Sequence, residues 1–154
     1  MNRILFVCLG NICRSPMAEG ILRHKAEHQG IKLNIDSAGT GNWHVGEHPD
    51  KRATKAAKDH GLDISSLVAR QMTEDDFEKF DMIYVADTEV YDGVVNIALN
   101  REHKLKVDYI MNLVHPDLNQ PVPDPYFGGA EGFENVFNML DKACDAIISK
   151  IKTK

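Results

Sequence analysis

One stretch decides the fold of this chain of 154 residues: Val7-Cys8-Leu9-Gly10-Asn11-Ile12-Cys13-Arg14-Ser15-Pro16. It closes the short apolar run Arg3–Cys8, whose composition is typical of a buried strand. Gly10 and Asn11 end that run. Ser15 and Pro16 then predict a helix start, with the serine hydroxyl at the cap and proline at the first helical position. The stretch therefore predicts a strand, a tight loop and a helix in direct succession.

The rest of the chain continues this alternation of strands and helices. Further strands are predicted at 33–38, 82–86 and 107–111, and helices at 15–30, 50–60, 73–80, after Asp87-Thr88 and at about 131–150. This order predicts an α/β fold with three layers: a doubly wound, four-stranded parallel sheet with helices on both faces. No repeat or linker interrupts the chain, so we expect a single domain over residues 1–154. Ligands of such sheets bind beyond the carboxyl ends of the strands, where the turn Cys8–Ser15 lies.

Composition excludes several functional classes. Hydrophobic residues make up 43% and charged residues 27%, an ordinary globular balance, and no stretch is apolar enough to predict a membrane span or a secretory signal. The formal net charge of −5 argues against nucleic acid as the main partner. The three cysteines, unevenly spaced, do not form a disulfide framework and indicate free thiols in a reducing cytoplasm.

The turn after the first strand has the features of an anion-binding loop. Successive main-chain N–H groups and a helix N-terminus converge there on one point. The loop lacks the lysine and second glycine of a nucleotide-binding loop, and carries Arg14 six residues after Cys8. A guanidinium can bind two phosphate oxygens at once, and the same donors favour the thiolate form of Cys8. The segment thus predicts a cysteine nucleophile with a phosphate receptor; the alternative is an ordinary strand-to-helix turn with a buried thiol.

Cleavage of a phosphate ester also needs a proton donor for the leaving group. The strongest candidate is Asp124, because Pro123 and Pro125 restrict the backbone on both sides of it. A solvated turn aspartate in a Pro/Gly loop fits the same composition. The residues alone leave these two interpretations open.

With Cys8, Arg14, Ser15 and Asp124 identified, the chain resembles the low-molecular-weight protein tyrosine phosphatases over nearly its whole length. The segments that carry the resemblance occur in the order of the family: VCLGNICRSPMAE, DSAGTGNWHVG, ARQ followed by TEDDF, and DPYF. Leu67 departs from the pattern, because many relatives carry there a histidine of the network that supports the phosphate loop. His48 and Lys51 replace prolines that are common in the family.

The resemblance implies an enzyme that hydrolyses phosphotyrosine in proteins through a phosphocysteine intermediate and releases inorganic phosphate, without a metal or other cofactor. Cys8 would be the nucleophile, Arg14 the phosphate clamp, and Asp124 first the acid and then the base that activates water. The other implied roles fall into three sets. The main-chain N–H groups of Leu9, Gly10, Asn11, Ile12, Cys13 and Arg14 would hold the phosphate; Asn11, Ser15 and Ser37 would form the supporting hydrogen-bond network; Trp43 and Tyr126 would line a slot for the phenyl ring.

Two residues keep a second interpretation. Cys13 is either a small packing residue beneath the loop or, as the resemblance favours, a partner that pairs with Cys8 on oxidation and protects it. Trp43 is either a half-buried packing residue or, because its loop is rich in glycine, part of the pocket rim. We expect Cys144, in the last helix, to be a core residue without a redox role.

Three other functions compete with this one. Arsenate reduction would need relay cysteines after the third strand, and Asp87–Leu99 contains none. Phosphoarginine hydrolysis is expected with a threonine at the position of Ile12. The third alternative is a phosphoprotein-binding module without turnover. The presence of Cys8, Arg14 and Asp124 together argues against it. His24 and His28, one helical turn apart, lack the third ligand that a metal site needs.

Overall fold

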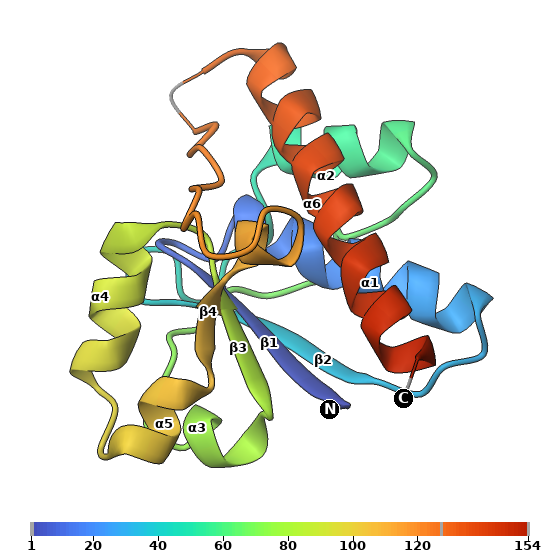
Figure 1. Ribbon diagram of the computed structural model, residues 1–154. Helices are drawn as coiled ribbons and strands as arrows, with labels where there is room; N and C mark the ends of the chain where they lie inside the picture. Colours follow the sequence, from blue (N-terminus) through green and yellow to red (C-terminus); the bar gives the residue numbers. More distant parts are fainter. Residues whose placement is uncertain (1, 127, 154) are drawn as a thin grey trace.

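The computed structural model describes residues 2–126 and 128–153; Phe127, the last residue of the segment DPYF, lies outside the described residues. Within them, four parallel strands form one sheet in the order β2-β1-β3-β4 (Figure 1). The strands are β1 (Arg3–Cys8), β2 (Asn34–Gly39), β3 (Met82–Val85) and β4 (Val107–Tyr109). The chain runs from β1 to one edge of the sheet and then returns across β1 to form β3. The carboxyl end of β1 is therefore the point at which the strand order reverses, and this is where such sheets bind ligands.

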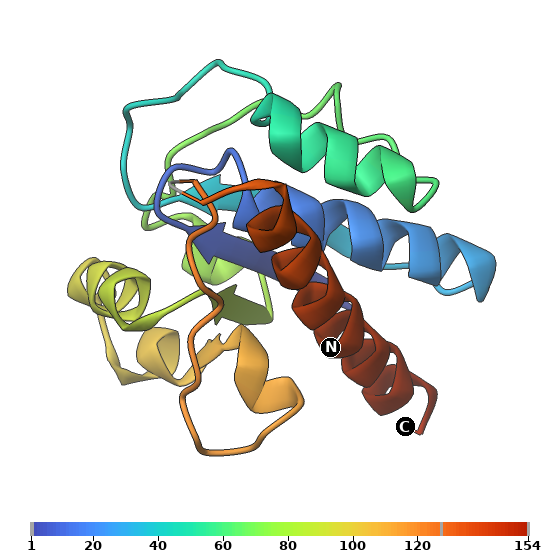
Figure 2. The same cartoon turned by 90° about the horizontal axis from the view of Figure 1, so that it is seen from above.

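Helices cover both faces of this sheet, as Figures 1 and 2 show. One layer consists of α1 (Arg14–His28), α2 (Lys51–Asp59) and α6 (Ala130–Lys152), and the other of α3 (Asp76–Lys79), α4 (Thr88–Asn96) and α5 (Arg101–Leu105). Alternate residues of β1 pack against the two helix layers, because successive side chains of a strand point to opposite faces of the sheet. Ile4 and Phe6 pack with α1 and α6, whereas Leu5 and Val7 pack with α3 and α4. The predicted three-layer α/β fold is confirmed.

Most element boundaries differ from the sequence prediction by a few residues, and two of these differences have a clear physical reason. Helix α1 begins at Arg14, with Cys13 as its N-cap and no side-chain cap bond, so Ser15 is not the cap. The Ser15 hydroxyl lies instead 3.0 Å from the sulfur of Cys8. The last strand was predicted to reach Met111, but β4 ends at Tyr109 and the 3₁₀ helix η1 (Ile110–Leu113) follows. A short apolar run alone does not separate a buried strand from a buried helical turn, and Ile110 and Met111 are buried in either form.

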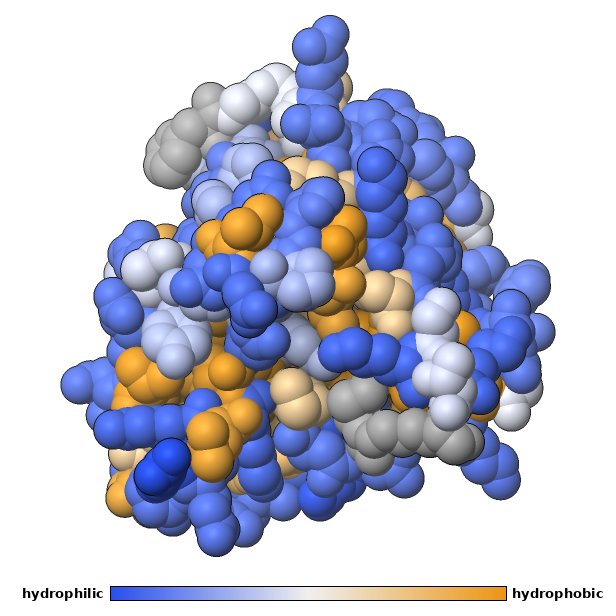
Figure 3. All heavy atoms as spheres, viewed as in Figure 1, coloured by the Kyte–Doolittle hydropathy of each residue, from blue (hydrophilic) through white to orange (hydrophobic). Residues whose placement is uncertain are grey.

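The surface in the view of Figure 3 is mostly hydrophilic, with apolar residues over the side of α4 and α5. Leu99 and Leu105, which are 66% and 69% exposed, belong to this part of the chain. None of the helices among the described residues combines the length and apolar character that crossing a bilayer requires.

Candidate active site

The phosphate loop, residues 8–15, leaves β1 in close contact with the end of β2. The main-chain N–H groups of Thr40 and Gly41 donate to the carbonyls of Cys8 and Leu9, at 3.0 and 2.9 Å. Gly39 lies directly beneath the loop: a Cβ atom there would meet the Leu9 carbonyl oxygen at 2.8 Å and the Gly10 carbonyl carbon at 3.1 Å. Only glycine allows this close approach of the two backbones, so Gly39 fixes the height of the loop above the sheet.

Cys8 lies at the bottom of the loop, with 3% of its surface exposed. The Ser15 hydroxyl is 3.0 Å from its sulfur and the Ser15 main-chain N–H donates to the same sulfur at 3.4 Å. Asn11 adopts a left-handed conformation with φ 57°, which a short polar side chain tolerates and which folds the loop tightly. Within the described part of the chain, the main-chain amides of residues 10–13 pair with no acceptor of the protein. They are donors that an anion above Cys8 can use.

Arg14 is 3% exposed and is held from one side. Its Nη1 donates to Asp87 Oδ2 at 2.7 Å and to the Val122 carbonyl at 2.8 Å. Its Nη2 is 4.0 Å from Asp124 Oδ2. Burial by itself lowers the pKa of Arg14, but the negative charges of Cys8 and Asp87 outweigh burial and raise it. Arg14 is therefore a permanent cation in a fixed position, with Nη2 turned toward the side on which Asp124 lies.

A pocket of about 180 Å³ joins these groups. Asp124 lies at its mouth, where its Oδ1 accepts from the Tyr126 main-chain N–H at 3.0 Å, and its side chain is 38% exposed. Trp43 is 67% exposed and its ring lies against Gly41, so it is a rim residue and not a core residue. The lining residues are Cys8, Leu9, Gly10, Ile12, Cys13, Arg14, Trp43, His44, Asp124 and Tyr126. The loop that carries Cys8, the carboxylate of Asp124 and the aromatic side chains of Trp43 and Tyr126 thus border one cavity.

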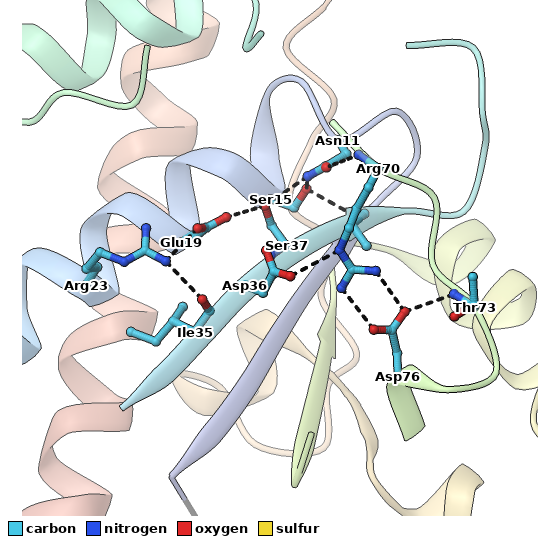
Figure 4. A network of polar contacts seen from close by, with 11 residues as sticks. Asn11, Ser15, Glu19, Arg23, Ile35, Asp36, Ser37, Arg70, Thr73 and Asp76 are labelled. Atoms are coloured by element: carbon cyan, nitrogen blue, oxygen red, sulfur yellow. Dashed lines mark hydrogen bonds and ion pairs between the residues drawn. The ribbon is translucent and has the colours of Figure 1, made fainter. Parts of the chain in front are cut away.

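A second group of polar residues supports the loop from below (Figure 4). Asn11 Nδ2 donates to the hydroxyls of Ser15 and Ser37, at 2.8 and 3.0 Å, and Asn11 Oδ1 accepts from the Arg70 main-chain N–H at 3.0 Å. The Arg70 guanidinium is held in turn by both oxygens of Asp76 and by Asp36. Both ends of the Asn11 amide are therefore hydrogen-bonded, although Leu67 stands where the resemblance led us to expect a supporting histidine.

The other two cysteines lie in different surroundings. Cys13 lines the same pocket as Cys8, and burial, followed by the charges of Asp50 and Cys8, raises the pKa of its thiol. Cys144 is fully buried in α6, as predicted, and burial raises its pKa as well. All three cysteines are free thiols. The pairing of Cys13 with Cys8 on oxidation stays a prediction.

The sequence reasoning missed several residues of the site. Asp87 entered the sequence analysis only as a residue before a predicted helix, although its carboxylate also holds Arg14, and His44 and Glu19 were given no role. Asp87 follows β3 at the same sheet edge as Cys8, and that position was a usable signal. Glu19, only 4% exposed, accepts from the Ser37 hydroxyl across the fold, and no pattern in the sequence marks this contact.

No group of three or more potential metal ligands occurs among the described residues. The rings of His24 and His28 lie 4.4 Å apart on α1 and have between them no third ligand from this set.

Comparison with known proteins identifies the family. The family model described as low molecular weight phosphotyrosine protein phosphatase matches residues 3–154. The low molecular weight phosphotyrosine protein phosphatase of Schizosaccharomyces pombe is 39% identical over 90% of this chain and 89% of its own. The low molecular weight protein-tyrosine-phosphatase YfkJ of Bacillus subtilis is 38% identical over 99% of this chain and 97% of its own.

A solved structure agrees with these relatives. The protein tyrosine phosphatase of Entamoeba histolytica superimposes with a TM-score of 0.91 at 34% identity, over 99% of this chain and 98% of its own. The sequence relatives, the solved structure and the pocket around Cys8 agree. The chain belongs to the low molecular weight protein tyrosine phosphatase family, whose members are cysteine-dependent hydrolases.

Proposed function

We propose that this chain acts as a single domain that hydrolyses phosphotyrosine in proteins through a phosphocysteine intermediate on Cys8. One observation carries the proposal: Cys8, Arg14 and Asp124 line a single pocket together with Trp43 and Tyr126. A thiol, a cation and a carboxylate supply the groups that phosphate-ester cleavage needs. The two aromatic side chains offer flat apolar walls to a phenyl ring.

In the first step, the Cys8 thiolate attacks phosphorus with an electron pair and an S–P bond forms. The bond between phosphorus and the tyrosine oxygen breaks, and Asp124 gives its proton to that oxygen. The non-bridging oxygens lie against the amides of residues 10–13 and against Arg14, whose Nη1 is already engaged by Asp87 and Val122. Charge that develops on these oxygens thus meets donors that are already in place.

In the second step, water attacks the phosphocysteine. Asp124, now a carboxylate, takes a proton from the water, the oxygen bonds to phosphorus, and the S–P bond breaks. The electron pair returns to Cys8, where the Ser15 hydroxyl at 3.0 Å and the Ser15 N–H at 3.4 Å stabilise the departing thiolate. Inorganic phosphate leaves, and neither step uses a metal.

The experiment that tests the proposal measures phosphate release from phosphotyrosine, phosphoserine and phosphoarginine peptides without added metal, by the wild type and Cys8→Ser. We expect release from phosphotyrosine only, abolished by Cys8→Ser, while binding of vanadate to the variant stays measurable. The serine oxygen is a much weaker nucleophile at neutral pH, but the amides and Arg14 that bind the anion are unchanged.

Each other outcome selects a different function. Release mainly from phosphoarginine would keep the mechanism and replace the substrate. If Cys8→Ser still hydrolyses phosphotyrosine, Cys8 is not the nucleophile. Absence of release from all three peptides would favour arsenate chemistry or a phosphoprotein-binding module, both of which the same loop can serve.

A further inference from the structure

Asp124 lies in the acid loop, of which the structure describes residues 122–126 and 128–129. The start of this loop is fixed to the sheet, because the Val122 main-chain N–H donates to the Ala86 carbonyl at 2.7 Å. Beyond Val122, the prolines on both sides of Asp124 restrict the backbone but have no N–H group to donate. Asp124 itself is exposed, so its place above the pocket depends on contacts made further along the loop.

Arg52, in the first turn of α2, reaches the acid loop from a helix that packs against α6 (Figure 1). Its Nη1 donates to the Gly128 carbonyl at 3.3 Å, and its guanidinium carbon lies 5.3 Å from the centre of the Tyr126 ring. The same carbon lies 4.7 Å from the centre of the buried Phe133 ring in α6. A planar guanidinium can lie against aromatic rings and still donate hydrogen bonds from its edge. Arg52 therefore joins the acid loop to both helices.

The guanidinium of Arg52 is itself held in place by Asp50. Nε and Nη2 of Arg52 donate to Oδ1 and Oδ2 of Asp50, each at 3.1 Å. The hydrogen bond from the Arg52 side chain lowers the pKa of Asp50, so this carboxylate stays ionised at neutral pH. The Asp50 main-chain N–H donates to the Ile12 carbonyl at 2.8 Å. A continuous set of contacts thus runs from the phosphate loop through Asp50 and Arg52 to the acid loop.

Two hydrogen bonds connect the residues that Arg52 contacts with the Asp124 carboxylate. The Tyr126 main-chain N–H donates to Asp124 Oδ1 at 3.0 Å. The Gly128 main-chain N–H donates to the carbonyl of Pro125, the neighbour of Asp124, at 3.0 Å. A displacement of Tyr126 or Gly128 therefore moves the carboxylate as well.

We propose that Arg52 is a positioning residue: it holds Tyr126 and Gly128, and so keeps the Asp124 carboxyl group within reach of the leaving oxygen. This inference rests on the proposed role of Asp124 as the proton donor. Arg52 lies outside the set of described residues that line the pocket, so it acts through the acid loop and does not touch the substrate.

Two other roles of Arg52 predict different results. If its charge attracted the phosphate group, Arg52→Ala would weaken the binding of vanadate and Arg52→Lys would restore it. If Arg52 only stabilised the fold, the loss of activity would be the same for every substrate. A positioning role predicts a loss that depends on the leaving group, because a misplaced donor matters only where the departing oxygen needs a proton.

The experiment measures kcat/KM for phenyl phosphate and 4-nitrophenyl phosphate in the wild type, Arg52→Ala, Arg52→Lys and Lys55→Ala. Both substrates place one phenyl ring in the pocket, but phenolate is as basic as the tyrosine side chain and 4-nitrophenolate is far less basic. The ratio kcat/KM reports the steps up to departure of the leaving group, so the later attack of water does not mask the difference.

Lys55 is the matched control, because it is a basic residue of the same helix, is 74% exposed and pairs with Asp59. Vanadate binding verifies that the phosphate loop is intact in each variant, and urea unfolding verifies the fold. Arg52→Ala keeps the main-chain N–H with which Arg52 satisfies the Asp50 cap of α2, so the helix start is preserved.

In Arg52→Ala we expect kcat/KM to fall about tenfold for phenyl phosphate and about twofold or less for 4-nitrophenyl phosphate. Arg52→Lys shows most of the same loss, because an ammonium group keeps the charge but cannot pair with both oxygens of Asp50 and contact the acid loop at once. Lys55→Ala matches the wild type, and vanadate binds equally to all four proteins. An equal change for the two substrates, or full activity of Arg52→Lys, overturns the proposal. If Arg52→Ala does not fold, Arg52→Lys alone decides between these results.

A double variant separates a failure of this inference from a failure of the proposed function. If Arg52 acts through Asp124, Arg52→Ala causes no further loss for phenyl phosphate in the Asp124→Ala background. If Asp124→Ala is sensitive to the leaving group and Arg52→Ala still adds its full factor, only the role of Arg52 is lost. If Asp124→Ala affects both substrates equally, Asp124 is not the proton donor, and the role of Arg52 is lost with it.

Discussion

Asp124 reaches the pocket from a loop between two prolines, and its carboxylate is already oriented by the Tyr126 N–H. As the proposed proton donor it matters most where the leaving group is a poor one. We expect Asp124→Ala to lower kcat for phosphotyrosine peptides by about 10²–10⁴-fold. For 4-nitrophenyl phosphate, whose leaving group needs little protonation, we expect a much smaller loss.

The measurement is kcat for the two substrates with wild type and Asp124→Ala, and vanadate binding serves as the control for an intact pocket. An equal loss on both substrates would assign Asp124 a structural role, in agreement with the alternative of a turn aspartate.

At the scale of single residues, the sequence predicted those parts of the site that lie within short motifs. Cys8, Arg14 and Ser15 share one loop, and their residue types and spacing pointed to an anion site there. Asp124 and Tyr126 share another loop; the residues alone left the role of Asp124 open, and Tyr126 was named only through the family resemblance. Glu19 contacts Ser37, and Arg70 contacts Asn11, only after folding brings distant segments together. No local pattern marks contacts of this kind, which is why they appear only in the structure.

Among the elements, α2 connects the phosphate loop to the pocket wall. Asp50 caps α2 by accepting from the Arg52 N–H at 2.8 Å, and the Asp50 N–H donates to the Ile12 carbonyl at 2.8 Å. The guanidinium of Arg52 also pairs with Asp50 and lies 5.3 Å from the centre of the Tyr126 ring. Asp50 thus contacts the phosphate loop at Ile12 and, through Arg52, the pocket wall at Tyr126.

We expect Asp50→Ala to lower the free energy of unfolding by about 1 kcal/mol, the usual cost of losing an N-cap. Asp50→Asn keeps an oxygen for the cap and loses only the ion pair with Arg52, whose side chain is 42% exposed; we expect it to cost about 0.5 kcal/mol or less. Urea unfolding of both variants checks this. Equal destabilisation by the two would show that the ion pair, and not the cap, is the stabilising contact.

The order of elements was predictable, and their ends were less so. The four strands and the longer helices were correctly identified, because the spacing of their apolar residues matches the period of a buried strand or of a helix. The start of α1 was misassigned because Ser15 has the chemistry of a cap, while the loop uses its hydroxyl at Cys8. Helix α5 was missed: it has five residues, too few for a periodic pattern, and is held by the Asn100 cap and the contact of His103 with Phe77.

For the whole molecule, the central strand β1 connects the site to the rest of the fold. Its carboxyl end carries Cys8, and residues at its amino end form hydrogen bonds with Asp81. Asp81 Oδ1 accepts from Arg3 Nη2 at 2.7 Å, and Asp81 Oδ2 accepts from the main-chain N–H groups of Arg3 and Asn2 at 3.1 and 3.3 Å. These contacts join the beginnings of β1 and β3, which are neighbours in the sheet.

These hydrogen bonds to Asp81 predict that the free energy of unfolding depends on pH. The side-chain hydrogen bond from Arg3, followed by the two main-chain hydrogen bonds, lowers the pKa of Asp81 from 3.8 to about 2. A carboxyl group with a lowered pKa in the folded state binds protons more weakly there than in the unfolded chain. Its contribution is therefore complete above pH 3.8 and is lost as the pH falls through about 2.

We expect Asp81→Asn to be less stable than the wild type at neutral pH by about 1 kcal/mol or less, since the Arg3 and Asp81 side chains are 41% and 32% exposed and water screens the pair. The difference should shrink as the pH falls below 3.8 and through about 2, the folded-state pKa at which half of the wild-type carboxyl groups have become neutral. Urea midpoints across this range measure it, with Asp59→Asn in the more exposed Lys55–Asp59 pair as the control. A difference that stays constant with pH would mean that the amide loses packing or hydrogen-bond geometry, and that the charge of Asp81 does not hold β1 to β3.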